Sequence, residues 1–173
     1  NRQIKDIENL VNEFSSFARM PNPIFKKIEV NSVVKRAMDF YKMSSLNEFS
    51  LIVSKKKLSI MGDEELLNRA FINLIKNSED SILEERLKNI DFKGKISVEI
   101  KGNSDYITIM LTDNGKGIED ITKIMTPYFT TKKDGTGLGL PIVSKIINEH
   151  NGDIVITNNS PGVKILITLP KIK

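Results

Sequence analysis

Apolar side chains recur every three or four residues in several parts of the chain, which is the spacing of an amphipathic helix. Residues 2–19 form the first such stretch, in which Ile4, Ile7 and Val11 share one stripe and two prolines follow the end. The heptad-like spacing predicts a helix that packs against another helix, in a bundle or a coiled coil.

Two further helices are predicted before the middle of the chain. The first follows Asn31, its expected N-cap, and its apolar face extends to Tyr41. The second covers residues 64–86 after Asp63, another expected N-cap, and carries two glutamates near the positive end of the helix dipole. Its apolar stripe, which we expect to be buried, consists of Leu66, Leu67, Ala70, Phe71, Leu74, Ile75, Ser78 and Ile82.

Alternating apolar and polar residues predict strands elsewhere. Residues 95–101 and 106–112 flank a short Gly-Asn turn, which predicts an antiparallel hairpin. A last hairpin is predicted from residues 155–158 and 163–169, around Ser-Pro-Gly. Short strands are also expected at residues 24–30, 49–53 and 58–60, the last two on either side of a lysine turn.

The segment between the two hairpins combines a loop with helices. Residues 118–125 are expected to form a short helix, and residues 126–136, which are rich in threonine and lysine, a mobile loop. A further helix is predicted over residues 140–149, closed by Asn-Gly. Pro141 is tolerated only in a first helical turn, so it fixes the start of this helix next to a run of glycines.

Composition narrows the class of protein. The 173 residues suit one domain with an appendage, and the absence of cysteine excludes disulfides and thiolate metal sites. The net charge is +4, but the lysines are scattered and not interleaved with aromatic residues. This favours a solvated surface over a nucleic-acid patch, so we expect no nucleic-acid partner. No apolar run is long enough to span a membrane, so we expect no membrane contact by this fragment.

Two patterns place polar side chains where a ligand can meet them. Asn73 and Asn77 are separated by one helical turn and project from one face, either as exposed surface residues or as a functional pair. Asp113 ends an alternating strand and is followed by Gly115 and Gly117, so a strand delivers a carboxylate into a glycine-rich turn. Such a carboxylate accepts a hydrogen bond from an exocyclic amine, such as that of adenine.

Glycines at 135, 137 and 139 open the helix that contains Pro141. Amide groups at a helix N-terminus bind phosphate oxygens well, and Lys132 and Lys133 precede the glycines and are suited to neutralise phosphate charge. The carboxamide of Asn77 suits Mg²⁺, which takes few protein ligands alongside phosphates and water. The only histidine, His150, lies near a helix C-terminus, and we interpret it as structural rather than catalytic.

These motifs occur in one order along the chain: Asn73-x-x-x-Asn77, Asp113-x-Gly115-x-Gly117, Pro127-Tyr128-Phe129 and Gly135-x-Gly137-x-Gly139. Together they resemble the catalytic ATP-binding domain of bacterial sensor histidine kinases, in the superfamily shared with gyrase and MutL ATPases. The segments at 14–21 and 129–137 are most similar to the nitrogen-regulation NtrY/NtrB type.

The resemblance implies an α/β two-layer sandwich, with a mixed, mostly antiparallel sheet, helices on one face and one N-terminal amphipathic helix in front. Residues 1–21 would be the end of a dimerisation hairpin and residues 22–173 the catalytic domain. Asn73 would face the γ-phosphate and Asn77 would coordinate Mg²⁺. The remaining ATP-binding residues implied are Asp113, Gly115, Gly117, Ile118, Phe129, Thr131, Lys132, Gly135, Thr136, Gly137, Leu138, Gly139 and Leu140.

The implied activity is transfer of the ATP γ-phosphate to a histidine on the dimerisation domain, for relay to an aspartate of a response regulator. That histidine motif is absent from the sequence, and the chain starts with Asn, so we expect a fragment that binds ATP·Mg²⁺ without phosphorylating itself. We expect the full-length parent protein to be a homodimer and this fragment to lie in the cytoplasm. An inner-membrane anchor elsewhere in the parent is compatible with both expectations.

Two departures and two alternatives accompany this interpretation. Many relatives carry lysine where this chain has Asp80, and alanine where it has Ser78, a change that we expect to be harmless. The alternatives are a serine kinase of the same superfamily and a non-catalytic nucleotide-binding module that mediates assembly. The amphipathic helix predicted at residues 2–19 disfavours the serine kinase. The two intact asparagines and the glycines disfavour the non-catalytic module.

Overall fold

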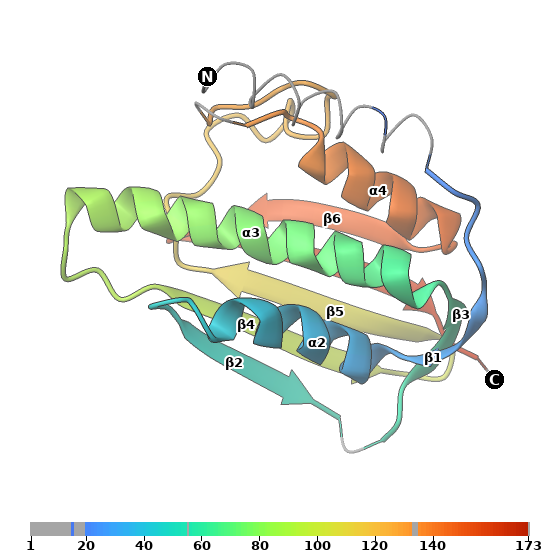
Figure 1. Cartoon of the computed structure of the whole chain (residues 1–173). Helices are drawn as coiled ribbons and strands as arrows, with labels where there is room; N and C mark the ends of the chain where they lie inside the picture. Colours follow the sequence, from blue (N-terminus) through green and yellow to red (C-terminus); the bar gives the residue numbers. More distant parts are fainter. Residues whose placement is uncertain (1–14, 16–19, 55, 133–134, 173) are drawn as a thin grey trace.

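Among the residues that the structure describes, five strands form one sheet and three helices cover one of its faces, so this part of the chain is a two-layer sandwich (Figure 1). The structure is a computed structural model that describes residue 15 and residues 20–54, 56–132 and 135–172. The helix predicted at residues 2–19 therefore lies outside the described residues, apart from residue 15, and the predicted boundary at residue 21 stays a prediction. No helix in the described ranges combines the length and apolarity that crossing a membrane requires.

The five-stranded sheet has the order β2-β4-β5-β7-β6. Strand β2 runs parallel to β4, whereas the other neighbours are antiparallel, which confirms a mixed, mostly antiparallel sheet. The two predicted hairpins are present as β4–β5 and β6–β7. The strands are β2 (Glu48–Val53), β4 (Lys95–Gly102), β5 (Tyr106–Asp113), β6 (Asp153–Asn158) and β7 (Val163–Pro170).

A small second sheet joins the start of the chain to the helical layer. Strands β1 (Lys26–Glu29) and β3 (Ser59–Gly62) pair antiparallel and lead into helices α2 (Val30–Lys42) and α3 (Glu64–Lys88). The strands on either side of the lysine turn therefore belong to different sheets, because β2 joins the large sheet and β3 the small one.

Helix α3 lies between α2 and α4 (Gly139–Glu149), above the middle of the sheet (Figure 1). This central position explains its long apolar stripe, and the buried residues of α3 are the ones that the sequence predicts. Its partners in the core are alternate residues of the three central strands: Ile96, Val98, Ile100, Ile107, Ile109, Leu111, Ile165, Ile167 and Leu169.

The ends of α3 and α4 follow the sequence rules. The carboxylate of Asp63 accepts hydrogen bonds from the N–H groups of Glu65 and Leu66, which confirms it as the N-cap of α3. At the C-terminus of α4, Asn151 adopts a left-handed conformation with φ of 55°, and the Gly152 N–H donates to the Ile147 carbonyl.

Two local predictions are wrong. Asn31 is not an N-cap: α2 begins at Val30, after Glu29, because β1 continues directly into the helix and the Val30 N–H donates to the Leu58 carbonyl. The helix expected at residues 118–125 is a series of turns. There Asp120 accepts hydrogen bonds from both the N–H and the hydroxyl of Thr122, a side-chain arrangement that competes with helix formation.

Candidate functional site

Strand β5 delivers Asp113 to the helical side of the sheet. Ile107, Ile109 and Leu111 are buried beneath the helices, and the period of two places the next alternate residue, Asp113, on the same face. Asp113 is only 5% exposed, at the point where the strand ends and the glycine-rich turn begins. A carboxylate so deeply placed requires hydrogen-bond donors.

Three donors hold the Asp113 carboxylate in one orientation. The Gly115 N–H donates to Oδ1 at 2.9 Å, the Ser78 hydroxyl donates to Oδ2 at 2.9 Å, and the Val163 N–H is a third donor. Burial raises the pKa of the Asp113 carboxyl above its ordinary value, although the three donors act in the opposite direction. The group is therefore an acceptor that is held in one orientation.

The turn after Asp113 is held by an asparagine from the last hairpin. Asn158 accepts a hydrogen bond from the Ile118 N–H at 2.8 Å and donates one to the Ile118 carbonyl at 2.8 Å. Gly117, with φ of 80°, supplies the left-handed residue that the turn needs. Asn158 thus fixes the backbone of the turn next to Asp113.

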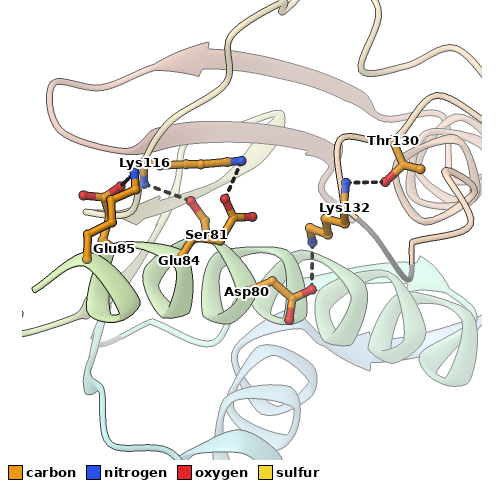
Figure 2. Close-up of polar contacts among 8 residues, drawn as sticks. Asp80, Ser81, Glu84, Glu85, Lys116, Thr130 and Lys132 are labelled. Atoms are coloured by element: carbon orange, nitrogen blue, oxygen red, sulfur yellow. Dashed lines mark hydrogen bonds and ion pairs between the residues drawn. The ribbon is translucent and has the colours of Figure 1, made fainter. Parts of the chain in front are cut away.

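Helix α3 carries the second part of the site. Asn73 and Asn77 are both half-buried, and they lie one turn apart as predicted. Oδ1 of Asn77 accepts a hydrogen bond from Nζ of Lys132 at 2.8 Å, and the same nitrogen lies 2.7 Å from Oδ2 of Asp80. Figure 2 shows Lys132 extended from its loop toward Asp80 on the helix.

The glycine segment joins the loop of Lys132 to the start of α4. Gly137 has a φ of 69°, and a Cβ there would lie 2.4 Å from the backbone of Tyr128. The Gly137 carbonyl accepts the Tyr128 N–H at 3.1 Å, so this glycine fastens the preceding loop to the start of α4. A Cβ on Gly139 would be in ordinary contact with Nδ2 of Asn77, at 4.0 Å, so the start of α4 lies close to Asn77.

Helix α4 begins after Leu138, whose apolar side chain gives no capping hydrogen bond to the helix. Backbone amides at such an end suit phosphate oxygens. The remaining predicted residues lie around this end. Leu138 is fully buried in the core, so only its backbone can meet a ligand. Leu140 packs against the core, and Thr136 accepts the Leu138 N–H. Phe129 and Gly135 are half-buried, and Thr131 is exposed.

His150 has a structural role, as the sequence suggests. It is 2% exposed, Nε2 accepts the Asp63 N–H at 2.8 Å, and Nδ1 lies 2.7 Å from the Ile146 carbonyl. These partners assign the proton to Nδ1, because a ring nitrogen that accepts an N–H cannot carry a proton itself. Both ring nitrogens are therefore used by the backbone and neither is available for phosphate transfer.

Sequence reasoning missed Ser78 and Asn158 as parts of the site. Ser78 was expected to be buried, and a buried hydroxyl requires a partner, so the signal existed without naming Asp113. Its hydroxyl donates to the carboxylate of Asp113, a contact that alanine at this position would lack; whether the change is harmless stays a prediction. Asn158 had no distinguishing signal in the sequence. Lys133 lies outside the described residues.

The residues present fit an adenine nucleotide with a divalent cation. Asp113 offers an acceptor for an amine, the start of α4 offers backbone amides suited to phosphate oxygens, and the oxygen of Asn77 already binds a cation, the Lys132 ammonium. In the described ranges no cluster of three or more histidine, cysteine or acidic side chains is suited to a metal.

The fold and site together define a nucleotide-binding ATPase domain of the α/β sandwich type. Comparison with protein families gives the same result: residues 62–173 match the histidine kinase-, DNA gyrase B- and HSP90-like ATPase family, which is well over half of the chain. The chain belongs to this family.

Named relatives and solved structures indicate which branch of the family is similar. The chain is 39% identical to an NtrY-like sensor histidine kinase of Rickettsia conorii over 91% of its length, and 32% identical to the nitrogen regulation protein NtrY of Azorhizobium caulinodans over 97%. It spans only 26% and 22% of these relatives. The catalytic domain of histidine kinase ThkA superposes with a TM-score of 0.74 at 26% identity, covering 86% of this chain and 96% of that domain.

Proposed function

We propose that the chain is the ATP·Mg²⁺-binding catalytic domain of a sensor histidine kinase, which transfers the γ-phosphate of ATP to a histidine of a dimerisation domain outside this sequence. One observation carries the proposal. Asp113, a buried and fixed acceptor, lies against the same turn of α3 that presents Asn77 toward the start of α4. The family match and the named relatives support ATP and the kinase activity.

The two ends of the nucleotide would be recognised from adjacent positions on α3. Ser78 holds Asp113, which would accept the hydrogen bond of the adenine amine, and the neighbouring Asn77 would meet Mg²⁺ and the phosphates. Because the positions are consecutive on one rigid helix, the distance between the two ends is set by the helix and not by a loop. Catalysis of this kind rests on positioning and on neutralisation of charge.

Asn73 would lie one turn before Asn77, toward the γ-phosphate and the incoming histidine. Its carboxamide positions a reacting group but cannot remove a proton from water. The transfer breaks the bond between the γ-phosphorus and the oxygen of the departing diphosphate and forms a bond to an imidazole nitrogen. With no general base at this position, transfer to water would be slow and transfer to histidine favoured.

The partners follow from the same proposal. The parent would be a homodimer through its dimerisation domain, located on the cytoplasmic side where ATP is available, and a response regulator would receive the phosphate on aspartate. A solved complex of histidine kinase ThkA with the response regulator protein TrrA shares the fold, with a TM-score of 0.79.

Phosphate transfer to a separate dimerisation hairpin tests the activity. The chain is mixed with labelled ATP, Mg²⁺ and a hairpin that carries the histidine, and we expect label on the hairpin alone. Without the hairpin the chain should stay unlabelled, since both nitrogens of His150 are engaged in the interior. Stable label on His150, or no transfer to the hairpin, would contradict the proposal.

A further inference from the structure

The ammonium of Lys132 lies between two oxygens of one turn of α3. Nζ is 2.8 Å from Oδ1 of Asn77 and 2.7 Å from Oδ2 of Asp80. Positions three apart share a helix face, and two oxygens that accept from the same nitrogen must converge on one point. The helix therefore presents a preformed pair of oxygen ligands to a cation, and Nδ2 of Asn77 lies within contact distance of a Cβ placed on Gly139, at the start of α4.

This pair has the chemistry of a Mg²⁺ site. An amide oxygen and a carboxylate oxygen are hard donors, and the site already holds a positive charge in the form of an ammonium. We propose that Asp80 belongs with Asn77 to the metal site, directly or through a water molecule, and that Lys132 takes the place of the metal when no nucleotide is bound. This inference rests on the proposed ATP·Mg²⁺ function.

Backbone hydrogen bonds hold Lys132 within the segment that leads to α4. The Lys132 N–H donates to the Thr130 hydroxyl at 3.1 Å, and the Lys132 carbonyl accepts the Gly135 N–H at 3.2 Å. The residue is therefore tied to the segment that opens α4, where phosphates would bind. When Mg²⁺ occupies Asn77 and Asp80, the ammonium is displaced but remains within the region of the phosphates, whose charge it then neutralises.

A purely structural ion pair explains the contact less well. The side chains of Lys132 and Asp80 are 32% and 37% exposed, and pairs of this exposure contribute little to stability. The two explanations also predict different effects of removing Lys132 and of removing Asp80. If the pair only attaches the loop to α3, removing either partner has the same effect. If Lys132 competes with the metal for Asp80, removing the lysine strengthens the action of the metal and removing the carboxylate weakens it.

The first test compares nucleotide affinity with and without metal. The dissociation constant of a fluorescent ATP analogue is measured in EDTA and in saturating Mg²⁺, and the ratio of the two reports how much the metal helps binding. We expect Lys132→Met to raise this ratio several-fold and Asp80→Asn to lower it about tenfold. Changes in the same direction, or an unchanged ratio for Asp80→Asn, would overturn the inference.

The second test changes the metal ion that the proposed site prefers, from Mg²⁺ to Cd²⁺. The chain has no cysteine, so Asp80→Cys introduces a single thiol, a ligand that favours soft ions such as Cd²⁺ over Mg²⁺. We expect the ratio to fall with Mg²⁺ and to recover with Cd²⁺. Glu84→Cys is the matched control, because Glu84 lies one turn further along α3 and pairs with Lys116 at 2.6 Å (Figure 2).

The control should respond to both metals like the unmodified chain. Failure of Cd²⁺ to restore the ratio in Asp80→Cys, or equal restoration in both variants, would overturn the role of Asp80. If the unmodified chain binds no nucleotide in either condition, the proposed ATP·Mg²⁺ function itself is wrong, and the inference about Asp80 is overturned with it.

Discussion

The hydroxyl of Ser78 donates a hydrogen bond to Oδ2 of Asp113 at 2.9 Å, and so joins the middle of α3 to the end of β5. Both groups are almost completely buried, with exposures of 2% and 5%. The contact links the helix that presents Asn77 to the strand that presents Asp113, the proposed adenine acceptor. Relative movement of helix and sheet would therefore change the distance between the two halves of the nucleotide site.

Replacing Ser78 tests this link. Ser78→Ala removes one donor from Asp113 without adding volume, and a hydrogen bond of this kind is worth about 1 kcal/mol, so we expect ATP affinity to fall roughly fivefold. Ser81→Ala is the comparison, since its hydroxyl accepts the Lys116 N–H and leaves Asp113 untouched. Calorimetric titration measures both. Equal losses, or no loss for Ser78→Ala, would show that the hydroxyl does not position the carboxylate.

The pH dependence of nucleotide binding should report the ionisation of Asp113. Burial raises its pKa, and only the ionised carboxylate is a full acceptor for the adenine amine, so affinity should fall as pH drops through this raised pKa. The stability of the fold should depend on the ionisation of Asp113 with the opposite sign. A carboxyl whose pKa is raised by folding costs stability when ionised, and that cost disappears as pH falls.

The control for this pH effect is Asp113→Asn. This variant retains the shape of the side chain but has no group that titrates, so its residual nucleotide affinity should lack the acid dependence. A parallel loss of affinity in both proteins would assign the effect to the nucleotide phosphates.

Two substitutions of Asp63, the N-cap of α3, should separate its capping hydrogen bonds from its negative charge. Asp63 accepts the Glu65 and Leu66 N–H groups and, through Oδ2, the Ile24 N–H at 2.8 Å. We expect Asp63→Ala to lower the free energy of unfolding by about 1–2 kcal/mol, and Asp63→Asn to retain most of it. Urea unfolding measures this difference, and equal stabilities of the two variants would contradict the capping role.

The charge of Asp63 adds a pH dependence with a defined sign. Partial desolvation raises its pKa, but the backbone donors outweigh this effect, and the folded pKa is lower than usual. Its contribution is therefore complete above the pKa of the unfolded chain and is lost as pH falls through the lower folded pKa. Asp63→Asn should lack this dependence in the same acidic window.

The space between α4 and α3 should be reserved for a ligand. A methyl group on Gly139 would meet only Asn77, at 4.0 Å, so we expect Gly139→Ala to fold with a stability within about 0.5 kcal/mol of the unmodified chain. The same methyl group would project into the proposed phosphate region and weaken ATP binding. Unchanged ATP affinity in a normally folded Gly139→Ala would contradict the assignment.

Much of the framework follows from local rules in the sequence. The period of 3.6 identifies the buried stripe of α3, Asp63 marks where α3 begins, and the period of two carries Asp113 to the end of β5. These features depend on neighbours a few residues apart. The two wrong predictions also concern local competition: Asp120 captures Thr122 and prevents a helix, and α2 begins one residue before Asn31 because β1 continues into it.

Contacts between distant residues could not be read from the sequence. Lys132 reaches Asn77 and Asp80 from more than fifty residues along the chain, and Asn158 holds Ile118 across forty. Such pairs depend on how the helical layer sits on the sheet. The parallel pairing of β2 with β4 likewise depends on strand order, which the alternation of residues does not specify.

The central claim is that Asp113 is the adenine acceptor of an ATP site, and Asp113→Asn tests it most directly. Hydrogen bonds to a charged group are worth about 1.5–3 kcal/mol, so ATP affinity should fall at least roughly tenfold. Removing a buried charge should leave the thermal midpoint without nucleotide unchanged or higher. Calorimetric titration of both proteins with ATP and Mg²⁺ decides the matter: equal affinities, or no binding by the unmodified chain, would contradict the account.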